Sequence, residues 1–251
     1  MDPTPASIGG YPIQSVLGTG GTSTVYLARH ADHLVALKVF DSGRRWPPTL
    51  AHPNIVPVYA SGETASGQRW TAMQYAPGGD ADTELRAGRM PPDRAVRIIA
   101  AVAEALDFAH SHGVVHGDVK PSNFLLDDHD RALLADFGAP PFAEDGMVLT
   151  SAAYASPEML RGADVDGRAD VYSLGCALFR LLTGKPPFFD AASKAEVVDC
   201  HLHRPAPCVT TFAPWLPATI DAVVAKAMAK NPAERYRSAR ALAAEAAEAL
   251  R

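Results

Sequence analysis

The chain has 251 residues, 47% of them apolar, and a formal net charge of −5. This length and apolar content are enough to bury a substantial core, as one large domain or two small lobes. The mild negative charge argues against a nucleic-acid partner. Because no run of eighteen apolar residues occurs and residues 1–10 lack the order of a signal peptide, we expect no membrane segment in this chain. We therefore expect a cytoplasmic protein, or the cytoplasmic domain of a membrane receptor if the sequence is a fragment.

The three cysteines, Cys176, Cys200 and Cys208, are odd in number and widely spaced. This usage fits a reducing compartment better than a disulfide framework. A zinc site that combines Cys200 and Cys208 with His201 and His203 is the alternative. The close C-x₂-C spacing of common zinc sites is missing, which makes that alternative weak.

The first folded segments are strand candidates around a glycine-rich turn. Residues 11–17 and 24–28 alternate between apolar and polar side chains, which predicts two strands. The turn at residues 18–23 contains Gly18 and Gly20, whose backbone N–H groups can approach an anion closely. Such a turn can lie over phosphates, but glycine-rich hairpins are common and the signal is weak alone.

A lysine at the end of the next predicted strand, 35–38, strengthens that interpretation. Lys38 follows three apolar residues, and a lysine on a buried strand is costly unless it has an anionic partner. Segments 56–60 and 69–75 supply two further strands, joined by a hairpin loop at 61–67. Residues 77–79, Pro-Gly-Gly, then mark a boundary. The apolar residues of 92–112 recur at intervals of three and four, which predicts an amphipathic helix.

The strongest chemical signal is the segment 116–123, which contains Asp118, Lys120 and Asn123. These side chains place a proton acceptor, a cation and a metal ligand on one loop. Asp136 follows the apolar run 132–135, thirteen residues after Asn123, so it can stand at the end of a strand. Two such oxygen ligands can hold Mg²⁺ beside a phosphate tail while Asp118 orients a hydroxyl, which is the arrangement for phosphoryl transfer.

These motifs, in this order, resemble the catalytic core of bacterial serine/threonine protein kinases from about Tyr11 to the C-terminus. The resemblance implies an α+β, bilobal protein-kinase fold with a five-stranded antiparallel N-lobe sheet and a mostly helical C-lobe. It divides the chain into an N-terminal tail (1–10), an N-lobe (11–76) and a C-lobe (77–251). The cofactors that it implies are ATP and Mg²⁺, and the partner is a protein substrate.

The resemblance also implies a role for each matching residue. Asp118 is the residue that orients the substrate hydroxyl or accepts its proton, and Lys120 neutralises the transferring phosphate, at a spacing typical of serine/threonine rather than tyrosine kinases. The Mg²⁺ ligands are Asn123 and Asp136. The residues expected around ATP are Gly18 and Gly20 in the turn, Val25, Ala36 and Leu125 at the adenine, Lys38 at the phosphates, and Gln74 and Ala76 through their main chain in the hinge.

The chain departs from the family at three places. Ser23 stands at the third glycine of the turn, and Gly117 stands where the family has an arginine that grips a phosphorylated loop. Residues 41–51 contain two adjacent prolines and no glutamate, so they leave no room for the helix whose glutamate pairs with the strand lysine. We therefore expect Lys38 to lack its clamp and one sheet face to stay uncovered, apart from cover by Trp46 and Leu50.

An uncovered sheet face predicts a homodimer or an activating partner at the N-lobe. Three structural roles complete the resemblance: an ion pair between Glu158 and Arg235, bracing of the catalytic loop by Asp170, and docking of the substrate hydroxyl by Ser151. Helices are expected near 193–201, 219–230 and 238–250.

Two functions are consistent with this sequence. The first is a serine/threonine protein kinase that transfers the ATP γ-phosphate to protein hydroxyls, attenuated or dependent on a partner. The second is a pseudokinase that serves as a binding or scaffold module. Retention of Lys38, Asp118, Asn123 and Asp136 favours the kinase, because groups that touch phosphate and metal supply most of the electrostatic stabilisation. The missing helix, Gly117 and Ser23 favour the pseudokinase.

Overall fold

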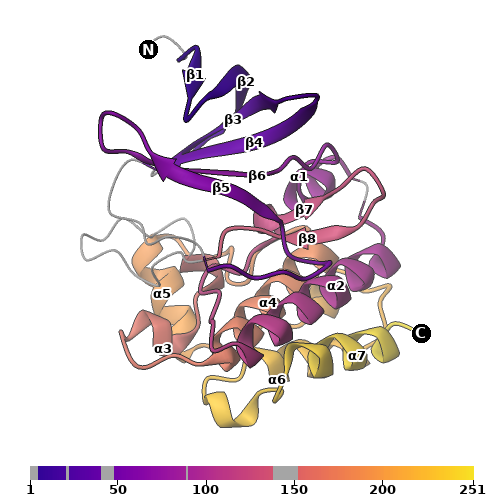
Figure 1. Ribbon diagram of the computed structural model, residues 1–251. Coiled ribbons are helices and arrows are strands. Elements are labelled where there is room, and N and C mark those ends of the chain that lie inside the picture. The colour runs from indigo at the N-terminus through magenta and orange to yellow at the C-terminus, as the bar shows by residue number, and fades with distance from the viewer. Residues whose placement is uncertain (1–4, 21–22, 41–47, 89, 138–151) are drawn as a thin grey trace.

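The computed structural model describes residues 5–20, 23–40, 48–88, 90–137 and 152–251. These residues form an N-lobe built on a sheet and a larger C-lobe built of helices, stacked one above the other (Figure 1). The expected α+β, bilobal architecture is confirmed. No helix in the described ranges is long and apolar enough to cross a membrane.

The N-lobe sheet is antiparallel and has six strands in the order β1-β2-β3-β4-β6-β5. The expectation of five strands is corrected here, because Ser7 and Ile8 of the supposed tail pair with Pro12 and Tyr11. Ile8 and Tyr11 are thereby buried against Trp70. The strands are β1 (Ser7–Ile8), β2 (Tyr11–Thr19), β3 (Ser23–His30), β4 (His33–Phe40), β5 (Val58–Glu63) and β6 (Arg69–Gln74).

Strand β4 shows how the sheet separates its two faces. Val35, Leu37 and Val39 point to one side and join the cluster around Trp70. Ala36 and Lys38 alternate with them and point to the other side, because successive side chains of a strand face opposite ways. Ala36 belongs to a second cluster, which meets the C-lobe. The sheet therefore has its own core on one face and the site on the other.

The C-lobe is built around α4, which is buried along almost its whole length. Helices α2, α6 and α7 pack against it, as the crossing of these helices in Figure 1 shows. A short hairpin of β7 (Phe124–Leu126) and β8 (Ala132–Leu134) lies on top of α2 and faces the N-lobe. The helices are α1 (Ala81–Arg86), α2 (Pro92–Ser111), α3 (Pro157–Leu160), α4 (Gly167–Thr183), α5 (Lys194–His203), α6 (Thr219–Ala227) and α7 (Ala239–Ala249). Four single 3₁₀ turns are η1 (Pro121–Asn123), η2 (Ala152–Tyr154), η3 (Val209–Thr211) and η4 (Pro232–Glu234).

The connection from β4 to β5 contains no helix in the residues that the structure describes there, 48–57. Asn54 and Val56 fasten this connection to the C-lobe instead: the carbonyl of Asn54 accepts from the N–H of Leu134 at 2.8 Å, and the N–H of Val56 donates to the carbonyl of Leu134 at 3.0 Å. Residues 48–57 therefore do not form the N-lobe helix of the family, as the sequence led us to expect. Trp46 lies outside the described residues, whereas Leu50 packs against the C-lobe core.

The expected ion pair between Glu158 and Arg235 is confirmed. It is bidentate, at 2.6 and 2.8 Å, and the Arg235 side chain is fully buried. Burial raises the pKa of the Glu158 carboxyl, but the hydrogen bonds and charge of Arg235, together with hydrogen bonds from the backbone and Ser156, hold that pKa below its usual value. The pair ties α3 to the segment after α6.

The first prediction concerns this ion pair. Glu158→Gln should lower the free energy of unfolding by about 3–5 kcal/mol, because it leaves the buried guanidinium without its carboxylate. Glu248→Gln is the control, since Glu248 forms an exposed pair with Arg251, and it should change stability by less than about 0.5 kcal/mol. Urea denaturation measures both, and a Glu158→Gln effect as small as the control would contradict the prediction.

The second prediction concerns His201, which is fully buried and bonded to the hydroxyl of Tyr172 at 2.9 Å. Burial, together with the charge of Lys230, lowers the pKa of His201 from 6.5 to about 3. The folded state therefore binds fewer protons than the unfolded state below pH 6.5, so the stability contributed by neutral His201 is complete above that pH and is lost as the pH falls toward 3.

Between pH 7.5 and pH 5, the native chain should lose about 2 kcal/mol more stability than His201→Gln, from about 1.4 kcal/mol per pH unit for one group. His129→Gln is the control, because the His129 side chain is 73% exposed, and it should keep the native pH dependence. Urea denaturation at the two pH values measures the difference. Equal slopes for the native chain and His201→Gln would show that His201 is free to take up a proton in the fold.

Candidate active site

The catalytic loop is held from below by Asp170 in the first turn of α4. The Asp170 side chain is fully buried and accepts the backbone N–H of His116 at 2.8 Å and that of Gly117 at 2.9 Å. It also bonds Nε2 of His110 at 2.7 Å. The expected bracing by Asp170 is confirmed, and a buried carboxylate needs this many donors to offset the loss of water.

His116 fixes the other side of the loop. Its Nδ1 accepts the backbone N–H of Asp118 at 3.1 Å, so the ring proton lies on Nε2, which donates to the carbonyl of Ala135 at 2.8 Å. The ring also contacts Phe137 edge-on, with centroids 4.5 Å apart. His116 therefore ties the catalytic loop to the segment that carries Asp136.

The three loop residues predicted from the sequence come together as a single group. Oδ2 of Asp118 accepts Nζ of Lys120 at 2.8 Å and Nδ2 of Asn123 at 3.2 Å, and Nδ2 of Asn123 also donates to the carbonyl of Asp118 at 2.7 Å. The other oxygen of Asp118, Oδ1, is buried without a hydrogen-bond partner among the described residues. These bonds hold one carboxylate oxygen in place, and the second oxygen keeps its capacity to accept a hydrogen bond.

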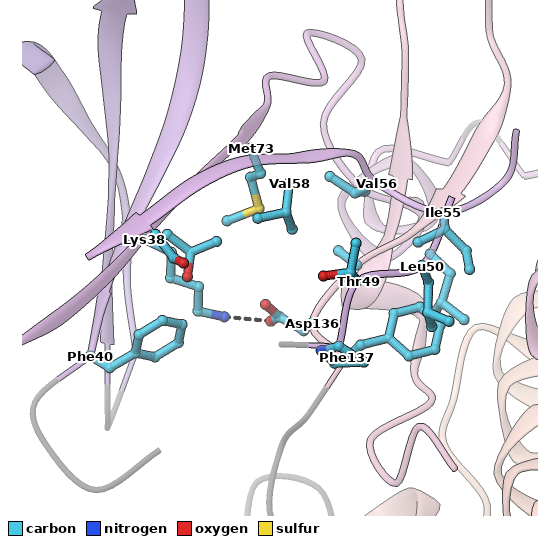
Figure 2. Close-up of a pocket in the computed structure, with 15 residues that line it drawn as sticks. Lys38, Phe40, Thr49, Leu50, Ile55, Val56, Val58, Met73, Asp136 and Phe137 are labelled. Atoms are coloured by element: carbon cyan, nitrogen blue, oxygen red, sulfur yellow. Dashed lines mark hydrogen bonds and ion pairs between the residues drawn. The ribbon is translucent and has the colours of Figure 1, made fainter. Parts of the chain in front are cut away.

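Lys38 and Asp136 form an ion pair across the cleft between the lobes (Figure 2). The Lys38 side chain is 10% exposed, and such an ammonium requires an anion nearby. Lys38 was expected to lack the glutamate that clamps it in the family, and residues 48–57 supply none. In the structure Lys38 is paired with Asp136, a residue also expected to bind the metal.

The backbone at Asp136 is unusual, with φ of 71° in the left-handed region. Aspartate tolerates this conformation better than most residues but still pays a strain cost of about 1–3 kcal/mol. The tight turn aims Asp136 back toward Lys38, whereas the next residue, Phe137, is turned toward His116. Strain of this kind is common where a side chain must be held for function.

The residues predicted around adenine lie in one apolar cluster between the lobes. Ala36 is a buried member, and Val25 and Leu125 pack against it with part of their surface exposed. Leu125 is placed by the neighbouring strand residue Leu126, which exchanges hydrogen bonds with Gly78 and Gly79 at 3.0 and 2.9 Å. A Cβ at Gly78 would lie 2.7 Å from the carbonyl oxygen of Leu126, so the hinge approaches β7 as closely as only glycine permits.

The remaining residues expected to contact the nucleotide lie in the turn and the hinge. Gly18 pairs with Val25 at the end of β2, and the N–H of Gly20 donates to the carbonyl of Ser23 at 2.8 Å. In the hinge, the N–H of Gln74 donates to Pro57 and the carbonyl of Ala76 accepts from Gly79. The roles of these residues stay predictions.

The donor set fits a magnesium nucleotide. Asn123 turns its Nδ2 toward Asp118, which leaves its amide oxygen as a possible ligand, and amide and carboxylate oxygens suit Mg²⁺. The buried Oδ1 of Asp118 is an unpartnered acceptor beside them. Asn123 and Asp136 would hold the metal, and Lys38 would face phosphate. When bound, the metal would neutralise charge on the phosphates.

A cavity opens next to Lys38 on the face of the sheet that meets the C-lobe. Its volume is about 130 Å³. In Figure 2 Met73, Val58 and Val56 line one side of it, and Thr49, Leu50 and Phe137 line the other. Val58 is 45% exposed, and Tyr59 beside it is 57% exposed. The described neighbours of Val58 on this face, Ala36, Lys38, Thr71 and Met73, are buried, so the uncovered sheet face stays a prediction.

Sequence reasoning missed two features of the site. The pairing of Lys38 with Asp136 joins residues 98 positions apart, and no local pattern indicates it. The role of His116 could have been suspected from a histidine placed two residues before Asp118, where a ring nitrogen can reach a backbone N–H. Gly138 and Ser151 lie outside the described residues.

Comparison with known proteins shows which family the chain belongs to. Residues 11–246 match the protein kinase domain. The chain is 48% identical over 268 residues to serine/threonine-protein kinase PknJ of Mycobacterium tuberculosis, covering 96% of this chain and 45% of the relative. It is 38% identical over 265 residues to PknH (96% and 42%) and 38% identical over 261 residues to PknF (92% and 54%) of the same organism.

The chain thus spans about half the length of these relatives. Each alignment is longer than the 251 residues of the chain, so the relatives carry residues within the aligned region that this chain lacks. The fold, the braced loop and these identities show that the chain belongs to the protein kinase family, as a catalytic domain of the bacterial serine/threonine type.

Proposed function

We propose that this chain transfers the γ-phosphate of ATP to serine or threonine hydroxyls of a protein. The observation that carries the proposal is the group of Asp118, Lys120 and Asn123, held rigidly by Asp170 and His116. A preorganised group of this kind stabilises a transition state without reorganising during the reaction. The names of the relatives, all serine/threonine-protein kinases, support the same class of acceptor.

Each residue has a distinct task in this reaction. Oδ1 of Asp118 accepts a hydrogen bond from the substrate hydroxyl and orients it toward the phosphorus. Lys120, fixed 2.8 Å from the other oxygen of Asp118, stabilises the charge on the transferring phosphoryl group. Lys38 neutralises phosphate from the N-lobe side. The apolar cluster of Val25, Ala36 and Leu125 excludes water from the base.

The pseudokinase alternative has little support. The sequence features that favoured it were the missing helix, Gly117 and Ser23. None of these features removes a side chain that would contact the hydroxyl, the metal or the phosphates. Gly117 has φ of 77°, so this position favours glycine for its backbone. A partner or second copy at the N-lobe remains a prediction, supported by the exposed side chains of Val58 and Tyr59 on β5.

The third prediction tests the catalytic carboxylate. Asp118→Asn should lower kcat by about 10²–10⁴-fold, because the amide is a poor base and cannot hold Lys120 by charge. Asp128→Asn is the matched control: its side chain is 67% exposed at the turn of the β7–β8 hairpin, and it should keep the native rate. Transfer of radiolabelled phosphate from ATP to casein measures both. Equal rates for Asp118→Asn and the native chain would exclude the proposed role.

The fourth prediction tests the nucleotide site. ATP with Mg²⁺ at about 100 times its Kd should raise the free energy of unfolding by about 2.7 kcal/mol, which corresponds to a rise in Tm of about 5–10 °C. Asp136→Asn should lose the part of this shift that depends on Mg²⁺, whereas Asp128→Asn should retain it. Thermal unfolding with ATP, in Mg²⁺ or in chelator, separates the two parts. A Tm that ignores both ATP and Mg²⁺ would count against a nucleotide site.

A further inference from the structure

A half-buried lysine of the C-lobe has no task in the reaction described above. Lys230 lies between the end of α6 and the turn η4, and its side chain reaches toward α4 and α5. Its ammonium donates to the hydroxyl of Tyr172 on α4 and to the carbonyl of Cys200 on α5, each at 3.3 Å. Among the residues that the structure describes, no carboxylate lies within ion-pair distance of Lys230.

The surroundings of this ammonium are aromatic rather than acidic. Nζ of Lys230 lies 5.6 Å from the ring centre of Tyr172 and 5.2 Å from that of Phe188, and both rings are buried. Because the oxygen of Tyr172 accepts from Lys230, its own proton points to Nδ1 of His201 at 2.9 Å. Contacts with ring faces offset part of the lost hydration of a cation, but they stabilise its charge less than a carboxylate does.

A second cation shares the Tyr172 ring. The guanidinium of Arg235 lies 4.9 Å from the ring centre, and its charge is matched by Glu158. Burial, reinforced by the charge of Arg235, lowers the pKa of Lys230 from 10.5 to about 8, although the two neighbouring cysteines act in the opposite direction. A lysine that is partly desolvated and lies beside another cation is a nucleophilic amine near neutral pH.

Arg204 gives this site a preference for an anionic reagent. Its guanidinium lies 5.8 Å from the centre of the Phe188 ring, which Lys230 also faces. The Arg204 side chain is 49% exposed and pairs with Asp190, which is 50% exposed. Exposed ion pairs are weak, so a phosphate group can compete with Asp190 for the guanidinium. The site therefore combines an amine nucleophile with a cation that suits phosphate.

We propose that Lys230 is a covalent modification site for a small acyl phosphate such as acetyl phosphate. The neutral amine attacks the acyl carbon, so that an N–C bond forms and the C–O bond to phosphate breaks. The phosphate leaves with the electron pair of that bond and takes up the proton that the amine loses, while Arg204 stabilises its charge. The product is an uncharged amide with one N–H donor in place of three, so either Tyr172 or Cys200 loses its hydrogen bond from this side chain.

Peptide mass spectrometry of the full chain, incubated with acetyl phosphate at pH 7.5, measures the acetylation rate of each lysine. Lys230 should react about 10-fold faster than Lys226, because its larger neutral fraction outweighs its lower basicity. Lys226 is the matched control, since it lies four residues earlier, is 46% exposed and pairs with Glu245. In the chain unfolded by urea the two rates should become equal. Equal rates in the folded chain, or an unchanged preference for Lys230 after unfolding, would overturn the proposal.

A substitution at Arg204 tests the choice of reagent. Arg204→Gln should lower the rate at Lys230 several-fold and leave Lys226 unchanged, because it removes the cation that attracts the phosphate. Arg97→Gln is the control, since Arg97 also forms an exposed pair, with Asp93, but lies on α2. A native rate at Lys230 in Arg204→Gln, or an equal loss in Arg97→Gln, would overturn the assignment to an acyl phosphate. These measurements involve no phosphoryl transfer to protein, so their outcome is independent of the proposed function.

Discussion

The fully buried carboxylate of Asp170 is the anchor on which the site depends. A charge without water must be matched by donors, and this one takes them from the backbone of His116 and Gly117 and from the ring of His110. Because Asp170 belongs to α4, the most deeply buried helix, the catalytic loop shares the rigidity of the C-lobe core. The positions of Asp118, Lys120 and Asn123 follow from this attachment.

Lys38 in the N-lobe also carries a charge with little access to water and needs a partner, but its partner comes from a different part of the chain. A nearly buried ammonium needs an anion, and the connection 48–57 offers none. Asp136 supplies the charge from the C-lobe, through a left-handed backbone turn. One carboxylate thereby serves as the partner of the lysine and as a candidate metal ligand.

The two faces of the N-lobe sheet are covered differently. The face that carries Trp70 has its own cluster, closed by the added strand β1. The opposite face meets the C-lobe and keeps a cavity beside Lys38.

The sequence by itself determined what is local. The catalytic loop was predictable because Asp118, Lys120 and Asn123 lie within six residues, and the strands and α2 follow from alternation and from spacings of three and four. Tertiary structure decided the rest: the pairing of β1, the Lys38–Asp136 ion pair, the unmatched hydroxyl of Thr71 and the burial of His201 beside Tyr172. These features depend on which distant segments come into contact and on how much water the contact excludes. Neither can be predicted from the spacing of residues along the chain.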